Sequence, residues 1–245
     1  MKIMIGVEVI YLFVAISCIS AAKLPSYIQP CKASDPKLNE CALKHGQEAL
    51  PMFIKGDPKY KIPNLVPFKL PSIKFNTGSL QVDLSNAVIN GLEVTEIKKV
   101  QIDLKNKHVS FVVSIANTNF FSNYEITGNI LILPISGKGM TNITFVGGEY
   151  TYDFDYDFID KQGDRYINIK SNKINFVTQR GYFHFDNLFG SDKQLGDQMN
   201  VFLNENWKDV QQELAPAITE TISSIITTSL AGIFEKVPYK DIILQ

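Results

Sequence analysis

Apolar and polar residues alternate strictly along the middle of the chain. In the clearest stretch, residues 150–158, every second residue is aromatic, and the positions between include Asp153, Asp155 and Asp157. A period of two places one face of a strand in a core and the other in water. We therefore interpret the three aspartates as a solvated face rather than a calcium site. Shorter runs of the same kind, separated by turn signals, recur from about residue 72 to residue 186 and predict an antiparallel meander of short strands.

The C-terminal part of the chain has a helical period instead. From Leu195 to Ile233, apolar residues recur at steps of three and four and form one stripe about 39 residues long. A single helix of that length would extend roughly 58 Å. Pro216 is expected to kink this helix without ending it, because the stripe resumes at Ile218. A coiled coil is the alternative interpretation of this segment.

A shorter helical face is predicted near the N-terminus, over residues 36–53. Ser34 or Asp35 can cap it, and the sequence Gly56-Asp57-Pro58 is expected to stop the chain from continuing as a helix. Three prolines between residues 62 and 71 then predict an extended connection that leads into the strands.

The long helix and the strands must cover each other, because each has one apolar face. A flat sheet cannot cover a helix of this length, whereas a strongly curved sheet can wrap around it. The predicted fold class is therefore α+β, with a long C-terminal helix wrapped in a highly curved antiparallel sheet. Large side chains around the helix could leave an apolar cavity, but periodicity does not show whether they do.

Residues 1–22 are expected to be a secretory signal peptide. Lys2 precedes an apolar run over residues 10–19, and Ser20-Ala21-Ala22 supplies the small residues of a cleavage site. Glu8 interrupts the run before it reaches the roughly 20 apolar residues that a membrane anchor needs. We expect no later stretch to be long and apolar enough to span a bilayer. The mature protein is thus predicted to be secreted and extracellular, without stable membrane insertion.

Secretion changes what two short features predict. Cys18 leaves with the signal peptide, so Cys31 and Cys41 remain in an oxidising compartment, where a disulfide between them is expected. The sequence Asn142-Ile143-Thr144 is an acceptor site for N-glycosylation at Asn142, although such sites often stay unmodified.

Composition and motifs argue against several classes of function. The 24 basic and 25 acidic residues give a net charge of −1, which does not support binding to nucleic acid. The three histidines, at positions 45, 108 and 184, are far apart in the sequence, and the motifs G-x-S-x-G, H-E-x-x-H and C-x-x-C do not occur. Gly137-Lys138-Gly139 lacks the spacing of a phosphate-binding loop. We therefore predict no enzyme activity, no metal and no cofactor.

Several segments together carry a recognisable pattern. Besides the two cysteines around the first helix, they are 86–92 (NAVINGL), 126–139 (ITGNILILPISGKG) with the acceptor site at 142–144, 187–200 (NLFGSDKQLGDQMN), 202–207 (FLNENW) and 233–239 (IFEKVPY). In these segments the chain resembles the takeout and juvenile-hormone-binding protein family of insects. The resemblance covers nearly all of residues 23–245, which are expected to form a single domain of that type.

The resemblance implies a fold related to bactericidal/permeability-increasing and lipid-transfer proteins. It also implies that a hydrophobic small molecule binds in an internal tunnel or pocket, without a cofactor. Juvenile-hormone carriers proper usually carry a second disulfide, between the sheet and the long helix. This chain retains only Cys31 and Cys41, so it resembles the takeout branch, and juvenile hormone itself is not implied as the ligand.

The function predicted from these features is a secreted, monomeric carrier of a terpenoid or a long-chain lipid. The alternatives are a secreted interaction or structural protein without a ligand cavity, and a lipid esterase. If an internal tunnel exists, its wall is expected to consist of inward-facing apolar residues, with Phe154 near the middle and Trp207 as a fluorescent reporter. The residues predicted to face inward are Phe53, Phe111, Val113, Tyr124, Ile132, Tyr152, Phe154, Phe176, Phe183, Phe202, Trp207, Ile218 and Ile222.

Overall fold

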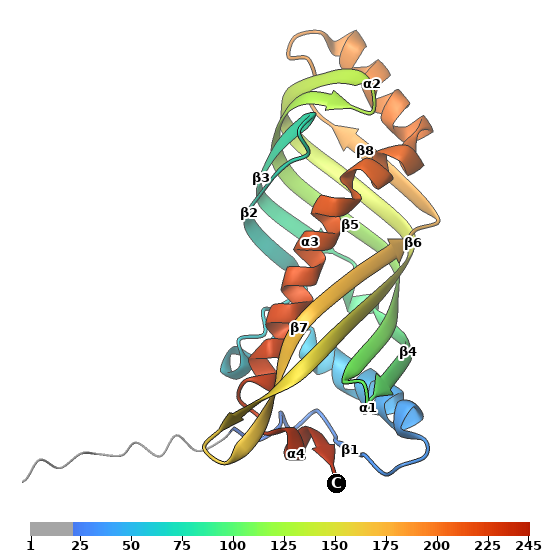
Figure 1. The fold of residues 1–245 in the computed structure, drawn as a ribbon. Coiled ribbons are helices and arrows are strands. Elements are labelled where there is room, and N and C mark those ends of the chain that lie inside the picture. The colour runs from blue at the N-terminus through green and yellow to red at the C-terminus, as the bar shows by residue number, and fades with distance from the viewer. Residues whose placement is uncertain (1–21) are drawn as a thin grey trace, which may run out of the picture.

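A long, curved antiparallel sheet cradles one long helix in the computed structural model, which describes residues 22–245 (Figure 1). The predicted signal peptide, residues 1–22, lies outside the described part of the chain except for Ala22. The helix crosses the concave face of the sheet, as the two apolar faces require. The predicted α+β fold class is confirmed.

Seven strands form the sheet, and their positions follow the predicted region closely. They are β2 (Phe68–Asn76), β3 (Leu80–Asn90), β4 (Glu96–Asp103), β5 (His108–Ile130), β6 (Leu133–Lys161), β7 (Asp164–Val177) and β8 (Arg180–Phe185). The hydrogen-bonded order is β2-β3-β5-β6-β7, with β4 also paired to β5 and β8 also paired to β6. The strand β2 begins inside the segment that was predicted to be a plain extended connection.

The prediction of uniformly short strands is wrong for β5 and β6, which are 23 and 29 residues long. Along one edge, β5 pairs first with β4 and then with β3, and β6 pairs first with β8 and then with β7. Each of these two strands therefore runs through both ends of the sheet. Gly147, with a φ of 64°, and Gly148 lie where β6 passes from pairing with β8 to pairing with β7. Glycine tolerates this backbone conformation. The Gly147-Gly148 dipeptide therefore marks an irregularity within β6, although such a dipeptide often marks the end of a strand.

The C-terminal stripe forms two helices rather than one. Helix α2 (Lys193–Glu205) ends one residue before helix α3 (Trp207–Phe234), and Asn206 between them has φ −104° and ψ 27°. The side chain of Asn206 donates a hydrogen bond to the carbonyl oxygen of Phe202 at 2.9 Å. The stripe continues across the break because both helices bury the same face. Pro216 lies inside α3 and does not end it, as predicted.

Helix α3 is also long and apolar enough to cross a membrane, by length and composition alone. The expectation that no such stretch follows the signal peptide was therefore wrong. In the fold, α3 packs against β7 and β8. Its exposed positions recur about every fourth residue and form a mostly polar stripe, at Gln212, Pro216, Glu220, Ser224 and Thr228.

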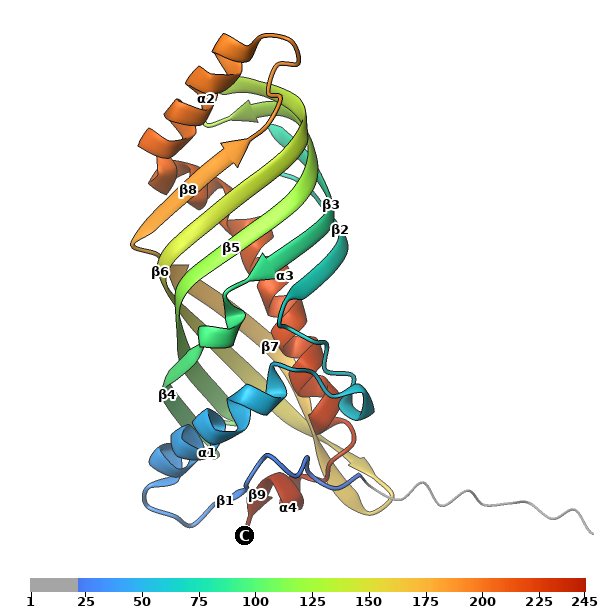
Figure 2. The ribbon, with the colours of Figure 1, turned by 180° about the vertical axis from the view of Figure 1, so that it is seen from behind.

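The first described residues and the C-terminal segment meet at the end of the sheet opposite α2 (Figure 2). Helix α1 (Leu38–Phe53), which the sequence predicts, packs there against β4. The short strand β1 (Cys31–Lys32) pairs in parallel with β9 (Ile243–Leu244), which directly follows helix α4 (Tyr239–Ile242). One-turn 3-10 helices, η1 (Pro58–Tyr60) and η2 (Leu92–Val94), complete the connections.

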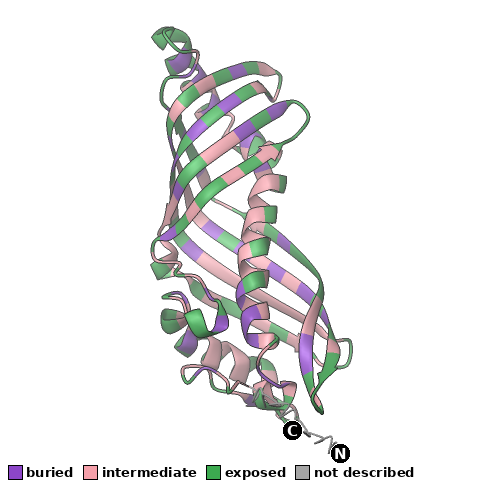
Figure 3. Ribbon diagram, turned by 90° about the vertical axis from the view of Figure 1, so that its left-hand side faces the viewer, coloured by how far each residue is buried: buried purple, intermediate pink, exposed green. Residues whose placement is uncertain are grey.

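Buried and exposed residues alternate along the strands, as the period of two predicts (Figure 3). The buried residues gather in two main clusters under α3. The α2-end cluster includes Leu80, Tyr124, Phe183, Leu203 and Val210. The aromatic cluster, toward the termini, consists of Tyr152, Phe154, Tyr156, Ile167 and Ile174, with partly buried residues of α3 packed against it. On the opposite face, Asp155 and Asp157 are exposed and Asp153 is half-buried, which confirms their face assignment.

Two glycines of the recognisable segments have a steric role. A Cβ atom on Gly91 would lie 2.0 Å from the carbonyl oxygen of Asn117, and one on Gly128 would lie 2.1 Å from that of Ser79. Both glycines also have positive φ angles, 92° and 122°. Any other residue would force neighbouring strands apart at these points.

Candidate functional site

An apolar cavity of about 160 Å³ lies between the concave face of the sheet and α3. Its wall consists of 22 residues from β2, β3, β5, β6, β7, β8 and α3. Of these residues, three have a polar atom in the side chain: Thr118, Tyr150 and Thr221. A concave apolar wall with few polar groups is typical of sites for hydrophobic small molecules.

Four of the residues predicted to face inward line this cavity: Phe176, Phe183, Ile218 and Ile222. They come from β7, β8 and α3, which are distant in the sequence and converge only in the fold. Half of the remaining wall is supplied by β2, β3 and β5, for example Ile73, Phe75 and Phe120, and the other half by β6, β8 and α3. Sequence reasoning missed Ile73 and Phe75, which alternate with Lys74 and Asn76 at the start of the predicted strand region but were not assigned an inward face.

Other predicted residues are inward-facing but belong to packed regions outside the cavity. Tyr152 and Phe154 lie in the aromatic cluster, and the ring of Phe111 packs 5.3 Å from that of Tyr152. Tyr124 is buried and its hydroxyl donates to the carbonyl oxygen of Asp186 at 2.5 Å. The placement of Phe154 near the middle of the cavity was therefore wrong, because side chains of α3 such as Phe234 pack against its cluster and fill the space.

The remaining predicted residues lie at the margins. Phe53 packs beside the Tyr60 and Val237 cluster near the termini, and Phe202 packs on the α2-end cluster. Val113 and Trp207 are half-buried and do not line the cavity. Ile132 is 88% exposed, so its inward assignment was wrong. It occupies the turn between β5 and β6, where the alternation of the strands no longer applies.

The cavity contains neutral polar groups at one end. Tyr150 is 7% exposed, and burial raises the pKa of its hydroxyl, while a hydrogen bond with Thr118 partly opposes that rise. The ring of Tyr150 stacks on that of Phe176, with centroids 5.8 Å apart and planes at 15°. The hydroxyl of Thr221 donates to the carbonyl oxygen of Ala217 at 2.9 Å. The Tyr150 hydroxyl therefore remains protonated at neutral pH and is paired with Thr118.

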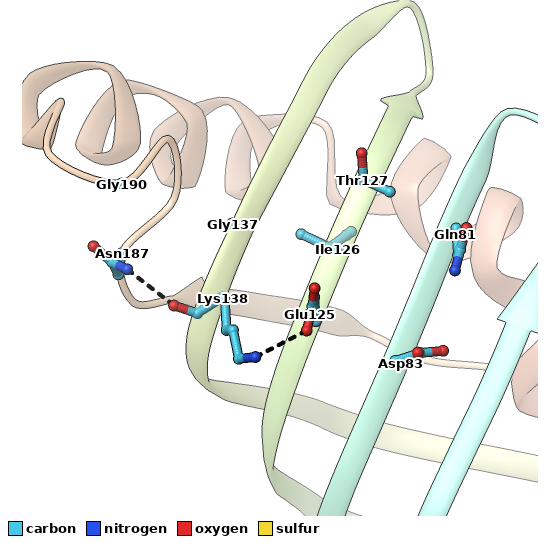
Figure 4. Close-up of a pocket in the computed structure, with 9 residues that line it drawn as sticks. All are labelled: Gln81, Asp83, Glu125, Ile126, Thr127, Gly137, Lys138, Asn187 and Gly190. Carbon is cyan, nitrogen blue, oxygen red and sulfur yellow. Dashed lines mark hydrogen bonds and ion pairs between the residues drawn. The ribbon is translucent and has the colours of Figure 1, made fainter.

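A second depression lies on the outer face of the sheet and is polar (Figure 4). Its charged groups already pair with one another: Lys138 Nζ lies 3.1 Å from Glu125 Oε2. Asn187 also donates to the Lys138 carbonyl oxygen at 3.0 Å. These exposed groups are already paired, Asp83 with Lys74 at 3.0 Å, and offer less to a ligand than the apolar cavity does.

The histidines do not converge on a catalytic arrangement. His108 contacts Asp155 at 2.8 Å on the outer face, and His184 contacts Asp186 at 3.0 Å. His45 lies 3.4 Å from the sulfur of Cys31, at the far end of the molecule. Within residues 22–245, the group whose ligand atoms lie close enough for a metal is Cys31, Cys41 and His45.

That cysteine pair forms the predicted disulfide, which is confirmed. Its sulfurs are bonded to each other, and a metal requires free thiolates. The possible glycan acceptor, Asn142, is exposed on β6, and its side-chain oxygen accepts a hydrogen bond from Asn119 at 2.8 Å. Glycosylation there stays a prediction.

Comparison with known proteins places these features in context. The family described as haemolymph juvenile hormone binding protein (JHBP) matches residues 9–244. The circadian clock-controlled protein daywake of Drosophila yakuba is 24% identical over 229 residues, and its Drosophila melanogaster counterpart is 24% identical over 230. Each alignment covers 89% of this chain and 87% of the relative. The crystal structure of Epiphyas postvittana Takeout 1 superposes with a TM-score of 0.80 at 27% identity, covering 89% of this chain and 100% of that one.

Proposed function

Because the chain belongs to the haemolymph juvenile hormone binding protein family, we propose that it is a carrier that holds a hydrophobic small molecule between the sheet and α3. The observation that carries this proposal is the cavity wall, in which 19 of 22 side chains are entirely apolar. Transfer of an apolar ligand from water into such a site contributes about 0.8 kcal/mol for each buried methylene. The proposed role is therefore binding and transport, without catalysis and without a cofactor.

The size of the cavity bears on how the ligand enters. Sites for ligands of this kind usually measure about 300–1,000 Å³, so the 160 Å³ space must expand to hold a fifteen-carbon terpenoid or a longer lipid. The wall is unevenly packed. Residues from β6 and β8, such as Ile135 and Phe183, are buried, whereas Ile73, Phe75 and Ile218 are half-buried. Expansion is expected on the side where β2 faces α3.

The polar groups of the wall define the kind of ligand. The wall contains no charged side chain, and its three polar side chains, Thr118, Tyr150 and Thr221, are neutral and already bond to protein groups. A charged head group would lose its hydration at a large energetic cost inside such a wall. The ligand class that fits best is a long apolar molecule whose head group is uncharged, such as an alcohol, ketone or ester.

The affinity expected for such a ligand follows from its size. Burial of fifteen carbons contributes roughly 12 kcal/mol, and association costs at least about 4 kcal/mol. Binding in the micromolar to submicromolar range is the expected result. The single cysteine pair favours a takeout-type carrier over a juvenile-hormone carrier proper.

We also infer that the protein acts outside the cell as a monomer. The family is described as a haemolymph protein, and the disulfide suits an oxidising compartment. The predicted signal peptide at residues 1–22 provides the route of secretion. The N-terminal sequence of the secreted protein, with Lys23 as the expected first residue, tests this part of the proposal.

The carrier function is tested by filling the cavity. Ala217 lines it from α3, whereas Ser224 lies on the exposed stripe of the same helix. Ala217→Phe should abolish binding of a fluorescent apolar probe, N-phenyl-1-naphthylamine, and Ser224→Phe should bind it as the wild type does.

Mass spectrometry of lipid extracted from the wild type should identify a co-purified apolar molecule. Absence of both extracted lipid and probe binding would favour an interaction protein, and ester turnover would favour an esterase.

A further inference from the structure

The cavity ends abruptly along β6 and β7. On the face toward α3, Tyr150 of β6 is paired with Phe176 of β7, and both line the cavity. The next inward-facing pair is Tyr152 with Ile174, and both of these belong to the aromatic cluster. The boundary between open space and packed core therefore falls between two successive cross-strand pairs.

On helix α3, the change from cavity-lining residues to residues packed on the aromatic cluster falls at the same level. Ile218 and Ile222 line the cavity, one helical turn apart. Ile222 also packs against the aromatic cluster, as does Ile226 one turn further on. Ile222 thus lies at the junction and closes the helix side of the boundary.

Packing fixes the two rings at this boundary. Their planes are nearly parallel, at 15°, with centroids 5.8 Å apart. The Tyr150 ring lies over Gly148, where a Cβ atom would come within 2.7 Å of the ring. Glycine at that position allows the ring to lie across the end of the cavity, against Phe176.

We propose that the stacked rings of Tyr150 and Phe176, together with Ile222, form an end wall that sets the longest apolar tail the protein accepts. This inference rests on the proposed carrier function. Phe176 is the specificity-determining residue of the wall, because it is half-buried near the end of β7 and can be shortened without opening the buried aromatic cluster. Removal of its ring should add the volume that the ring occupies to the cavity and lengthen the accepted tail.

The test measures affinity against tail length. Straight-chain primary alcohols of about eight to eighteen carbons displace N-phenyl-1-naphthylamine from the wild type and from Phe176→Ala. Each added methylene should raise the affinity about fourfold until the tail reaches the wall, after which further carbons should add nothing. In Phe176→Ala the gain should continue for at least two more methylenes, about 15-fold in affinity. Phe176→Leu, a milder change, should give a smaller shift in the same direction.

Phe111→Ala is the matched control, since its ring lies behind the wall against Tyr152. It should leave the limiting tail length unchanged. Three outcomes would overturn the end wall while the carrier function stands. They are the same limiting tail length in the wild type and both Phe176 variants, a gain in affinity without a limit in the wild type, and an equal extension of the tail by Phe111→Ala. Failure of every alcohol to displace the probe, or of the probe to bind, would overturn the carrier function and the wall together.

Discussion

The carboxylate of Glu213 on α3 accepts a hydrogen bond from the backbone N–H of Leu131 at 2.6 Å. This bond joins the long helix to the turn between β5 and β6, 82 residues away in sequence. Leu131 has a φ of 54°, a left-handed conformation that a residue with a side chain adopts at some energetic cost. Residues on both sides of this turn, Ile130 and Ile135, line the cavity, so the bond holds one end of the cavity in place.

Loss of this bond should loosen the turn. Glu213→Ala leaves a partly buried N–H without its charged acceptor, and hydrogen bonds of this kind stabilise a fold by about 1–3 kcal/mol. We expect the free energy of unfolding, measured in urea, to fall by that amount. Amide hydrogen exchange should rise at residues 128–135. Glu220→Ala, on the exposed stripe of the same helix, should change neither quantity, and equal effects of the two variants would contradict this prediction.

The aromatic cluster should contribute to stability rather than to ligand binding. Phe154 is 4% exposed, and its ring centroid lies 6.0 Å from that of Tyr152 and 6.1 Å from that of Phe234. Phe154→Ala should lower the free energy of unfolding by about 3–5 kcal/mol, because a large cavity would remain. Asp155→Asn, on the opposite face of the same strand, should leave the thermal midpoint close to that of the wild type. A small loss of stability in Phe154→Ala would show that this part of the sheet is loosely packed.

The disulfide should hold more than the first helix. Cys41 lies in α1, and Cys31 lies in β1, which pairs with β9 at the C-terminus. Replacing both cysteines by serine should cost about 2–3 kcal/mol, which for a domain of this size lowers the melting temperature by about 4–12 °C. The variant should still fold, because the main sheet and α3 do not depend on the bond. Circular dichroism melts measure the shift, and a variant without cooperative melting would show a larger role.

Buried tyrosines should make the fold sensitive to alkali. Burial, reinforced by Asp186, raises the pKa of Tyr124 to about 12, and burial with the neighbouring Tyr239 raises that of Tyr156 to about 12, against an ordinary value of 10.0. The folded state therefore retains protons that the unfolded chain releases. This stabilisation is complete below pH 10 and is lost progressively as the pH rises from 10 to 12.

Urea unfolding at a series of pH values measures this loss. The free energy of unfolding should decline between pH 10 and pH 12. Tyr124→Phe should reduce the slope in that range, while Tyr182→Phe, at an exposed position, should leave it unchanged. A slope identical in Tyr124→Phe and the wild type would show that Tyr124 ionises in the folded state as it does in the unfolded chain.

Local patterns in the sequence were sufficient to predict the elements and their inward faces. The alternation at 150–158 placed the aromatic residues inside and the aspartates outside, and the stripe from Leu195 to Ile233 identified the helical region. Both patterns depend on backbone geometry, which repeats at a fixed period in strands and helices. The cysteine count, together with the predicted secretion, was likewise sufficient to predict the disulfide.

The pattern of apolar and polar residues could not predict where a helix is interrupted or where one strand pairs with two others along the same edge. The helix break at Asn206 leaves the apolar stripe intact, because α2 and α3 bury the same face. The lengths of β5 and β6 depend on which strands pair with them, and pairing joins residues far apart in sequence. Ile132 continues the alternation of β5 although it lies in a turn.

The sequence by itself determined the family, the sheet, the helix and the side of each strand that faces inward. Only the tertiary structure decided that Phe176 and Ile218 face open space, while Phe154, with the same pattern, is packed. The physical reason is that periodicity fixes the direction of a side chain, whereas a cavity depends on the distance between α3 and the sheet. That distance follows from the bulk of side chains on strands and helix that only the fold brings together.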